Sequence, residues 1–543
     1  MWSTWLEYAR NDNDELVVGP ILTTLFLTLL PLVLLIIFLL HRRKSTQTIP
    51  ASPLPPGPTG LPLVGYLPFL RTDLHRQFTE LSSLYGPIYK LWLGKKLCVV
   101  IGSTSLAKQV LRDHDTVFAN HDMSVTAYVA TYGGNDIVFQ PYGPEWKKLR
   151  KIFVREMLSK SSLDGMYGLR REEVMKSVRH VYDVVYKAGT SPVDFGSLAG
   201  STVVNVIMSM IGGVSLKAGE KTIDGVEFRK LTTELMVLIG KPNVSDLFPG
   251  LAWLDIQGIE RETKKVIRVF DAMFGSAIEE RKRIITEGGG EVQRKDFLQL
   301  LLEMINDHDH EDGTNATTIS LAQLKAILMI IGHCSGWNGH NNDCAGMGNG
   351  RASQESRGNE VQEELTQVVG LTNTVEDFHL SKLTYLNAVI KETLRLHPPV
   401  PLLVPRYPSQ STTIGGYNVP KGAKIFLNVW AMHKDPSNWE NPLEFRPERF
   451  LNNSDDDDDD ASKFDLLGNN FNFIPFGSGR RACAGVPLAE RMLLYVLASF
   501  LHAFEWELPC GGKVELSEIC GIVLKKREPL LIFPTPRLSI IYR

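Results

Sequence analysis

The chain has 543 residues, and its 58 basic and 61 acidic residues leave a net charge of -3. A balance so close to neutral offers no basic surface for nucleic acid, so we expect no nucleic-acid partner. The six cysteines are scattered without CxxC pairs, which argues against a disulfide framework or a zinc site and indicates a reducing, cytosol-facing setting.

The N-terminal part predicts a membrane anchor. Residues 16–40 form a run of 25 residues without a charge, and about 20 are enough to cross a bilayer core. Acidic residues dominate before this run and a basic cluster follows it, so the positive-inside rule places residues 1–15 in the lumen and the remainder in the cytosol. A cleaved signal peptide is the alternative, but the run is too long and its basic cluster comes after it. We therefore predict a single-pass anchor in the endoplasmic reticulum membrane, with a basic, proline-rich hinge over residues 41–60.

The remainder, residues 61–543, predicts one large domain that is mainly α-helical with small β-sheets. A helical pattern over Leu74–Tyr85 precedes two short strands, Ile88–Leu93 and Cys98–Ile101, which we expect to form a hairpin. Residues 166–309 show apolar side chains at three- and four-residue spacing, which predicts successive amphipathic helices.

Two helices carry charged side chains on a defined face. In the helix that begins near Tyr142, Trp146 and Arg150 are four residues apart and share one side. In the helix predicted over residues 385–397, Glu392 and Arg395 project together. Each pair alone is also compatible with an ordinary solvated helix face.

The residues around Cys483 predict a thiolate site. Small residues flank this cysteine, a turn with glycines at 477 and 479 precedes it, and a helical run, Val486–His502, follows it. Glycine permits positive φ in such a turn, and the N-terminus of the helix would stabilise a sulfur anion. A buried free cysteine is the alternative.

The segment from 476 to 485 resembles the haem-binding loop of the cytochrome P450 enzymes, Phe-x-x-Gly-x-Arg-x-Cys-x-Gly, and most of the chain, except for one segment, resembles the plant microsomal branch of that family. The resemblance implies haem b with Cys483 as the proximal iron ligand and Phe476 over the sulfur. It also implies propionate contacts from Trp146, Arg150, Arg406 and Arg481. Glu392 and Arg395, with Arg449 of the Phe-x-Pro-Glu-Arg-Phe segment, would form a buried charge network. Arg406 follows residues 402–404, which we expect to be a strand.

The reaction that this resemblance implies is monooxygenation, in which one atom of O2 enters a small apolar plant metabolite, such as a terpenoid or a phenolic flavonoid. The chain carries no Gly-x-Gly-x-x-Gly fingerprint or flavin motif, so electrons should come from NADPH through a separate cytochrome P450 reductase. Lys147, Lys148 and Lys151 would help to dock it.

Residues 330–360 depart from the family pattern. Members carry a distal helix here, with Gly-Gly-x-Asp-Thr supplying the acid and the alcohol for oxygen activation, and this chain has neither residue in place. It has seven glycines instead, which oppose a helix by roughly 7 kcal/mol at about 1 kcal/mol each. No catalytic acid–alcohol pair is therefore intact in the printed sequence.

A frame shift explains this departure. In the frame one nucleotide later, Trp337 and the first base of Asn338 force glycine, and Met347 with Gly348 forces tryptophan. Permitted codon choices for residues 332–360 then spell Asp-Ile-Val-Val-Gly-Gly-Thr-Asp-Thr and the remaining distal helix, which rejoins the printed frame at Val361. The hypothesis is a frame-shifted segment, from a record error or a real lesion. The competing interpretation is a divergent loop.

Two other functions remain alternatives. A haem-thiolate isomerase or dehydratase needs no proton delivery to oxygen and tolerates the loss of the acid and the alcohol. A catalytically impaired haem-binding relic of the family is what the printed sequence encodes if the lesion is real.

Overall fold

The computed structural model describes residues 29, 33, 52–188, 191–211, 216–218, 221–223, 225–287, 296–306, 319–331, 358–451, 464–509, 515 and 517–538. The predicted lumenal segment, almost all of the predicted anchor and residues 332–357 of the departing segment lie outside these residues.

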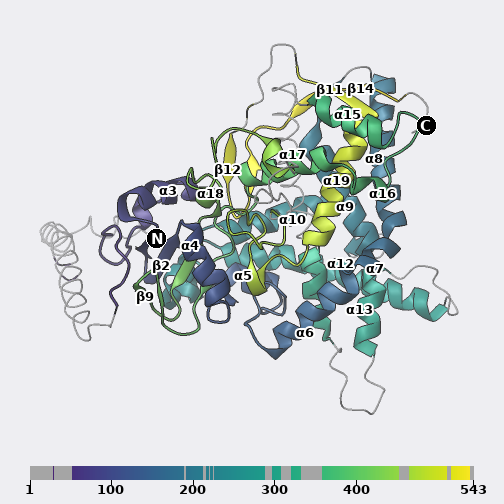
Figure 1. Cartoon of the computed structure of the whole chain (residues 1–543). Helices are drawn as coiled ribbons and strands as arrows, with labels where there is room; N and C mark the ends of the chain where they lie inside the picture. The colour runs from purple at the N-terminus through teal and green to yellow at the C-terminus, as the bar shows by residue number, and fades with distance from the viewer. Residues whose placement is uncertain are drawn as a thin grey trace, which may run out of the picture.

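Helices make up most of the described chain (Figure 1). They are α3 (Leu74–Tyr85), α4 (Thr104–Lys108), α5 (Val125–Ala130), α6 (Pro144–Ile152), α7 (Lys160–Gly165), α8 (Tyr167–Ala188), α9 (Phe195–Ile211), α10 (Gly225–Gly240), α11 (Val244–Leu247), α12 (Ile259–Glu287), α13 (Phe297–Asn306), α15 (Gly358–Val368), α16 (Asp377–Leu380), α17 (Thr384–Leu396), α18 (Val429–Met432) and α19 (Val486–Ala503). A further apolar helix is described over Leu321–Ile331. Short 3-10 or π-helical turns are η1 (Leu67–Phe69), η2 (Gln109–Asp113), η3 (Phe153–Met157), η4 (Pro249–Leu254), η6 (Pro447–Phe450) and η8 (Gly479–Arg481).

The strands form small sheets. They are β1 (Ile88–Leu93), β2 (Lys96–Ile101), β3 (Asn120–His121), β4 (Val193–Asp194), β5 (Leu216–Ala218), β6 (Lys221–Ile223), β7 (Arg406–Tyr407), β8 (Thr412–Ile414), β9 (Tyr417–Val419), β10 (Lys424–Leu427), β11 (Phe504–Glu507), β12 (Glu518–Cys520), β13 (Leu524–Lys526) and β14 (Leu531–Pro536). The largest sheet has the order β1-β2-β10-β7-β3, with β10 parallel to β2, and a second sheet has the order β11-β14-β4. This mixture confirms the predicted class of mainly α with small β-sheets.

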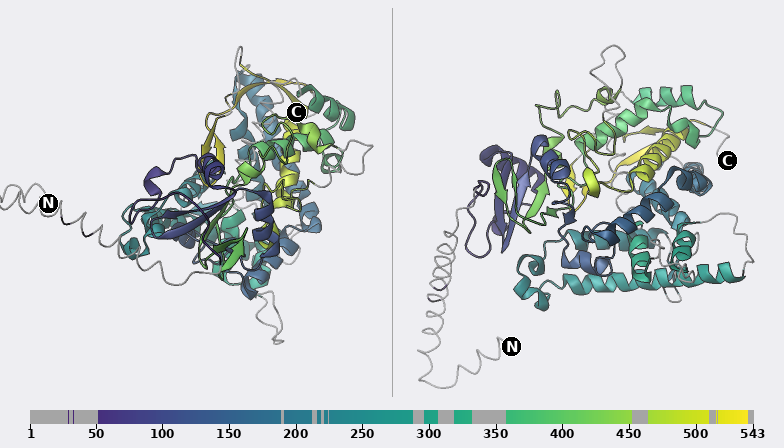
Figure 2. Two further views of the ribbon diagram at one scale, coloured as in Figure 1. Left: turned by 60° about the vertical axis from the view of Figure 1, so that its left-hand side comes forward. Right: turned by 60° about the horizontal axis from the view of Figure 1, so that its bottom comes forward.

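The five-stranded sheet has one helical layer against each face, because successive side chains of a strand point to opposite sides. Val99 and Ile101 of β2 pack with residues of α4 and η2, whereas Cys98 and Val100 pack with Phe78 of α3. Figure 2 shows this sheet at one end of the molecule and the long helix α12 along the helical part.

Helix α19 runs through the main core, and its side chains from Leu488 to Ala503 are almost all buried. Within the described part of the chain it is the one helix long and apolar enough to cross a membrane, but 83% of it is buried in protein. It is therefore a core helix of this domain.

Most of the predicted elements are confirmed. The helix expected over Leu74–Tyr85 has those bounds, and the expected strand pair is the β1–β2 hairpin. The strand expected over residues 402–404 is wrong: these residues form a turn, with Leu403 at φ 51°, and the strand begins at Arg406.

Candidate functional site

The loop that carries Cys483 lies between a tight glycine turn and the start of α19. Gly477 and Gly479 have φ of 74° and 72°, where side chains are disfavoured. A Cβ on Gly479 would lie 2.3 Å from the carbonyl oxygen of Leu111, so only glycine fits against η2. The backbone N–H of Cys483 donates to the carbonyl of Phe476 at 3.0 Å, which closes the loop. Phe476 itself is partly buried against the main core.

Groups around the sulfur act in opposite directions on the pKa of its thiol. Burial raises the pKa of the Cys483 thiol, whereas the backbone N–H groups of Gly485 and Val486 and the Arg150 guanidinium act in the opposite direction. The two N–H groups belong to the first turn of α19, where donors have no partner within the helix. Burial is the larger effect, so the pKa of the free Cys483 thiol is raised, and the N–H groups and Arg150 are placed to support an anion that a bound metal ion would hold there.

Arg481 joins the loop to the segment between β3 and α6. It is only 7% exposed, and its guanidinium donates to backbone carbonyls of Ala119, Ile137, Val138 and Gln140. It also lies over the Trp146 ring, 4.3 Å from the centroid.

Arg150 and Trp146 lie together on α6, as their spacing predicted. The Arg150 side chain donates to the carbonyl of Ala482, next to the cysteine, at 2.8 Å. The Trp146 indole N–H donates to the carbonyl of Ile137 at 2.9 Å. Helix α6 is thus fixed to Ala482 in the cysteine loop and to Ile137 in the segment before the helix.

Arg406 lies on β7, between β10 and the edge strand β3, and is 2% exposed. It donates to the carbonyls of Phe118 at 3.4 Å and Ser478 at 3.2 Å. Burial lowers the pKa of Arg406 and of Arg481 to about 10, which is the cost of holding two cations away from water.

The hydrogen-bond partners of these three arginines show whether the site suits a haem. Among the described residues, Arg150, Arg406 and Arg481 donate to backbone carbonyls and none forms an ion pair with a carboxylate. Buried cations are normally paired with an anion, and these arginines have no paired carboxylate, although Asp136 lies near Arg481 and Asp115 near Arg406. The two propionates of a haem would supply such carboxylates next to Cys483. The residues therefore fit the group.

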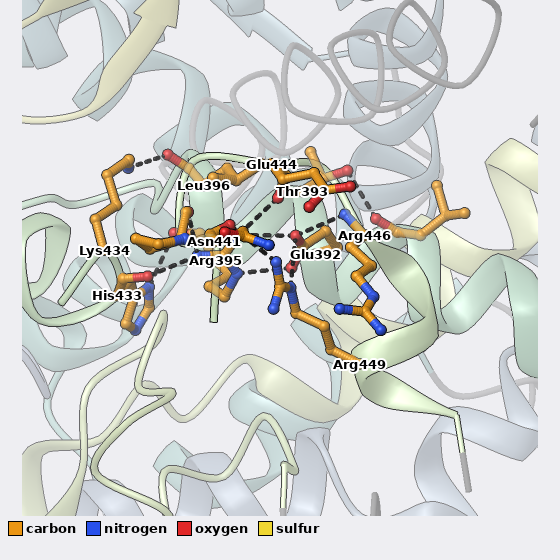
Figure 3. Close-up of polar contacts among 12 residues, drawn as sticks. Glu392, Thr393, Arg395, Leu396, His433, Lys434, Asn441, Glu444, Arg446 and Arg449 are labelled. Atoms are coloured by element: carbon orange, nitrogen blue, oxygen red, sulfur yellow. Dashed lines mark hydrogen bonds and ion pairs between the residues drawn. The ribbon is translucent and has the colours of Figure 1, made fainter. Parts of the chain in front are cut away.

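A second cluster, shown in Figure 3, stabilises the core behind the loop. Glu392 and Arg395 are fully buried and form two hydrogen bonds of 2.6 and 2.7 Å. The Arg449 Nε lies 3.4 Å from the same carboxylate, and the backbone N–H of Arg446 donates to it at 2.9 Å. The remaining Arg395 donors reach backbone carbonyls, including those of His433 and Pro442 at 2.8 Å each. The predicted network is thus assembled and closely paired.

Sequence reasoning missed two histidines. His433 is fully buried; its Nδ1 lies 3.2 Å from the carbonyl of Arg395, and its Nε2 accepts from the backbone N–H of Ile474 at 2.9 Å, which joins the network to the start of the loop. His121 lies among the three arginines, opposite Arg406 in the β3–β7 pair. Neither stands in a recognisable motif, so only the tertiary contacts identify them.

The structure brings together all of the predicted proximal residues, but the distal side is described only as far as Ile331. The segment with the missing acid–alcohol pair lies outside the described residues.

Comparison with known proteins gives one consistent result. The model of the family described as Cytochrome P450 matches residues 55–333 and 355–533. Flavonoid 3'-monooxygenase from Petunia hybrida is 37% identical, with 90% of this chain and 93% of the relative covered. The enzyme of the same name from Arabidopsis thaliana is 35% identical, with 95% and 98% covered. Flavonoid 3',5'-hydroxylase from Campanula medium is 33% identical, with 89% and 92% covered. A zebra fish cytochrome P450 structure with progesterone is 25% identical and has a TM-score of 0.67, with 85% of this chain and 99% of that chain covered.

Proposed function

Because the chain belongs to the cytochrome P450 family, we propose that Cys483 is its proximal haem ligand and that Trp146, Arg150, Arg406 and Arg481 surround the propionates. The observation that carries this assignment is the group of three guanidiniums beside Cys483, two of them buried and that of Arg150 partly buried, whose hydrogen bonds all go to neutral carbonyls. Phe476 covers the sulfur side of the loop.

The chain is a haem-thiolate monooxygenase by its family and relatives. When bound, the haem supplies the activation of O2, and a cysteinate ligand favours cleavage of the O–O bond. The protein's part on this side of the site is to hold the sulfur as an anion with the N–H groups of Gly485 and Val486. The arginines orient the group by its propionates, and the Glu392–Arg395–Arg449 network keeps the loop in place.

The substrate that we assign is a flavonoid-type phenolic, and the reaction is hydroxylation of its aromatic ring. Support comes from the relatives, three of which are named as flavonoid monooxygenases or hydroxylases over about nine-tenths of this chain or more. A terpenoid is the alternative substrate class. Incubation of the protein with reductase, NADPH and matched panels of flavonoids and terpenoids tests this choice. We expect a product heavier by one oxygen from a flavonoid; a product from terpenoids alone would contradict the assignment.

The electron donor in this proposal is a separate NADPH-dependent cytochrome P450 reductase. Lys147 and Lys151 are exposed on α6, and Lys148 is partly exposed and paired with Glu145 at 3.0 Å. This basic face lies on the helix that contacts the cysteine loop, so a docked donor would be close to the haem. Reversing Lys147 and Lys151 to glutamate should slow reduction of the haem and leave its spectrum unchanged.

The location in this proposal is the endoplasmic reticulum membrane. Residues 16–40 would form the single anchor, residues 1–15 would be lumenal, and residues 61–543 would face the cytosol behind the hinge of residues 41–60. Fractionation of the full chain and of a chain without residues 1–40 tests this arrangement, because only the full chain should resist extraction from membranes by alkaline carbonate.

The active form of the enzyme, we propose, carries the shifted-frame distal helix in place of residues 332–360. The family match supports this proposal, because it is interrupted between residues 333 and 355 and resumes in the same order. Sequencing of the transcript across the codons for Met329 to Val361 tests it. An in-frame Gly-Gly-Thr-Asp-Thr is the expected result. A transcript that reads as printed would instead leave a chain that binds haem without activating oxygen, or an isomerase or dehydratase that turns over without reductase.

A further inference from the structure

His121 is a buried histidine at the centre of the cationic cluster. It lies on β3, directly opposite Arg406 of β7 in the strand pairing, and is 7% exposed. Its Nδ1 lies 2.8 Å from the carbonyl oxygen of Val138, the same oxygen to which Arg481 donates at 3.1 Å. The imidazole and the Arg481 guanidinium are therefore immediate neighbours.

The hydrogen bond of Nδ1 fixes the tautomer of the ring. A carbonyl oxygen only accepts, so Nδ1 carries a hydrogen and, in the neutral ring, Nε2 carries a lone pair. Burial holds the pKa of His121 well below its usual value, and the positive charges of Arg406, Arg481 and Arg150 lower it further. Without an anion in the cluster, His121 is thus neutral at physiological pH.

Other charged groups near this cluster are few among the described residues. Asp136 lies near Arg481 and is itself buried, which raises its pKa to about 6 although backbone N–H groups act against this. Asp115 lies near Arg406 and pairs with Arg480 at 2.9 Å. The field at His121 is therefore dominated by the three guanidiniums.

We propose that His121 is a further contact of the haem propionates and that it takes up one proton from water at Nε2 when the haem binds. This inference rests on the proposed haem site. The two negative charges of the propionates favour the protonated, positively charged form of His121, whereas the arginines disfavour it. A carboxylate oxygen only accepts hydrogen bonds, so an oxygen that faces Nε2 requires a hydrogen on that nitrogen. The proton converts a repelling lone pair into a charge-assisted hydrogen bond.

The sign of the pH effect follows from the direction of this change. Binding raises the pKa of His121 above its value in the haem-free protein, so its contribution to haem affinity is lost as the pH rises through the bound-state pKa. Between the pKa of His121 in the haem-free protein and its pKa in the haem-bound protein, the affinity for haem falls by up to about tenfold for each pH unit. This is the limit for the release of one linked proton.

The test measures haem release, which is independent of turnover. The full chain is loaded with haem, an excess of a haem-scavenging apo-globin is added, and the Soret region is followed from neutral to mildly alkaline pH. We expect release from the unmodified chain to accelerate with pH. His121→Gln should release haem quickly with little pH dependence, and His121→Arg should hold it with little pH dependence, because arginine stays charged. His180→Gln, an exposed histidine on α8, is the matched control and should behave as the unmodified chain.

Each other outcome overturns the inference in a distinguishable way. If the unmodified chain binds haem and its pH profile persists in His121→Gln and His121→Arg, another group such as Asp136 carries the proton, and the proposed haem site stands without the inference. If no variant binds haem at any pH, the proposed function fails together with it.

Discussion

The two sides of the haem site differ in how the chain specifies them. The proximal side is built from segments far apart in sequence: Arg481 reaches carbonyls at residues 119–140, and Arg395 reaches those of residues 433–444. In our proposal, the distal side depends on one continuous helix, and there the family match is interrupted from residue 334 to residue 354. A lesion confined to that segment would therefore remove the distal chemistry and leave the contacts around Cys483 in place. Haem binding and oxygen activation should accordingly be separable in this chain.

The largest effect that we expect is the loss of thiolate ligation in Cys483→Ala. The substitution removes the sulfur and leaves the loop's backbone hydrogen bonds, so the reduced protein should lose the carbon monoxide difference band of a thiolate-bound haem completely. Cys520→Ala is the matched control, because Cys520 is a partly exposed free cysteine on β12. A thiolate-type band in Cys483→Ala would show that the proximal side has been assigned to the wrong residue.

Breaking the buried network should have the next largest effect. Glu392→Gln leaves Arg395 buried without its counter-charge, which should lower the free energy of unfolding by about 3–5 kcal/mol. Arg283→Ala, which breaks an exposed pair with Glu280 on α12, should leave the free energy of unfolding almost unchanged, because solvent screens an exposed ion pair. Urea unfolding of the two variants measures the difference. Equal costs would mean that the network does not stabilise the proximal side.

Two contributions to the cost of replacing Gly479 can be measured separately: its positive φ and the close contact of the loop with η2. Gly416→Ala has φ of 84° and open space around the new methyl group, so it should cost only the left-handed penalty of about 1–2 kcal/mol. Gly479→Ala pays the same penalty and also places a Cβ against the Leu111 carbonyl, which should add about 1–3 kcal/mol. Urea unfolding and haem release should both be impaired more in Gly479→Ala. Equal losses of stability and of haem retention in the two variants would show that the contact of the loop with η2 does not restrict the residue at position 479.

The effect that is smallest near neutral pH, and that grows only in acid, concerns the stability of the proximal side. Burial lowers the pKa of His433 to about 3, below that of an unfolded histidine, so the unfolded chain binds a proton that the folded chain refuses. Stability should therefore fall as the pH drops below about 6.5, by up to about 1.4 kcal/mol per pH unit from this residue. In His433→Gln that part of the slope should vanish, whereas His180→Gln should keep the full slope. Parallel slopes in all three proteins would contradict the assignment of the proton to His433.

Local patterns were sufficient to predict the proximal elements. The helices around Trp146, Glu392 and the start of α19, and the need for glycine at position 479, follow from spacing and from chemistry within a few residues. The strand expected over residues 402–404 is wrong because its apolar composition also suits a buried turn, in which Leu403 adopts positive φ. His433 and His121 were not predicted because their roles depend on partners brought close only by the fold, such as Ile474 and Arg406. The fold class could be predicted from the sequence. The gathering of three arginines without a paired carboxylate beside Cys483 could not, because it depends on contacts that only the fold creates.

The most direct test compares the printed chain with a chain whose residues 332–360 are replaced by the shifted-frame helix. Both are reduced under carbon monoxide and then incubated with reductase, NADPH and a flavonoid. We predict the same thiolate-type band in both, because the proximal side is unchanged, and hydroxylated product with matching NADPH consumption only from the replaced chain. Equal product from both chains would contradict the separation of haem binding from oxygen activation, as would a thiolate-type band confined to the replaced chain.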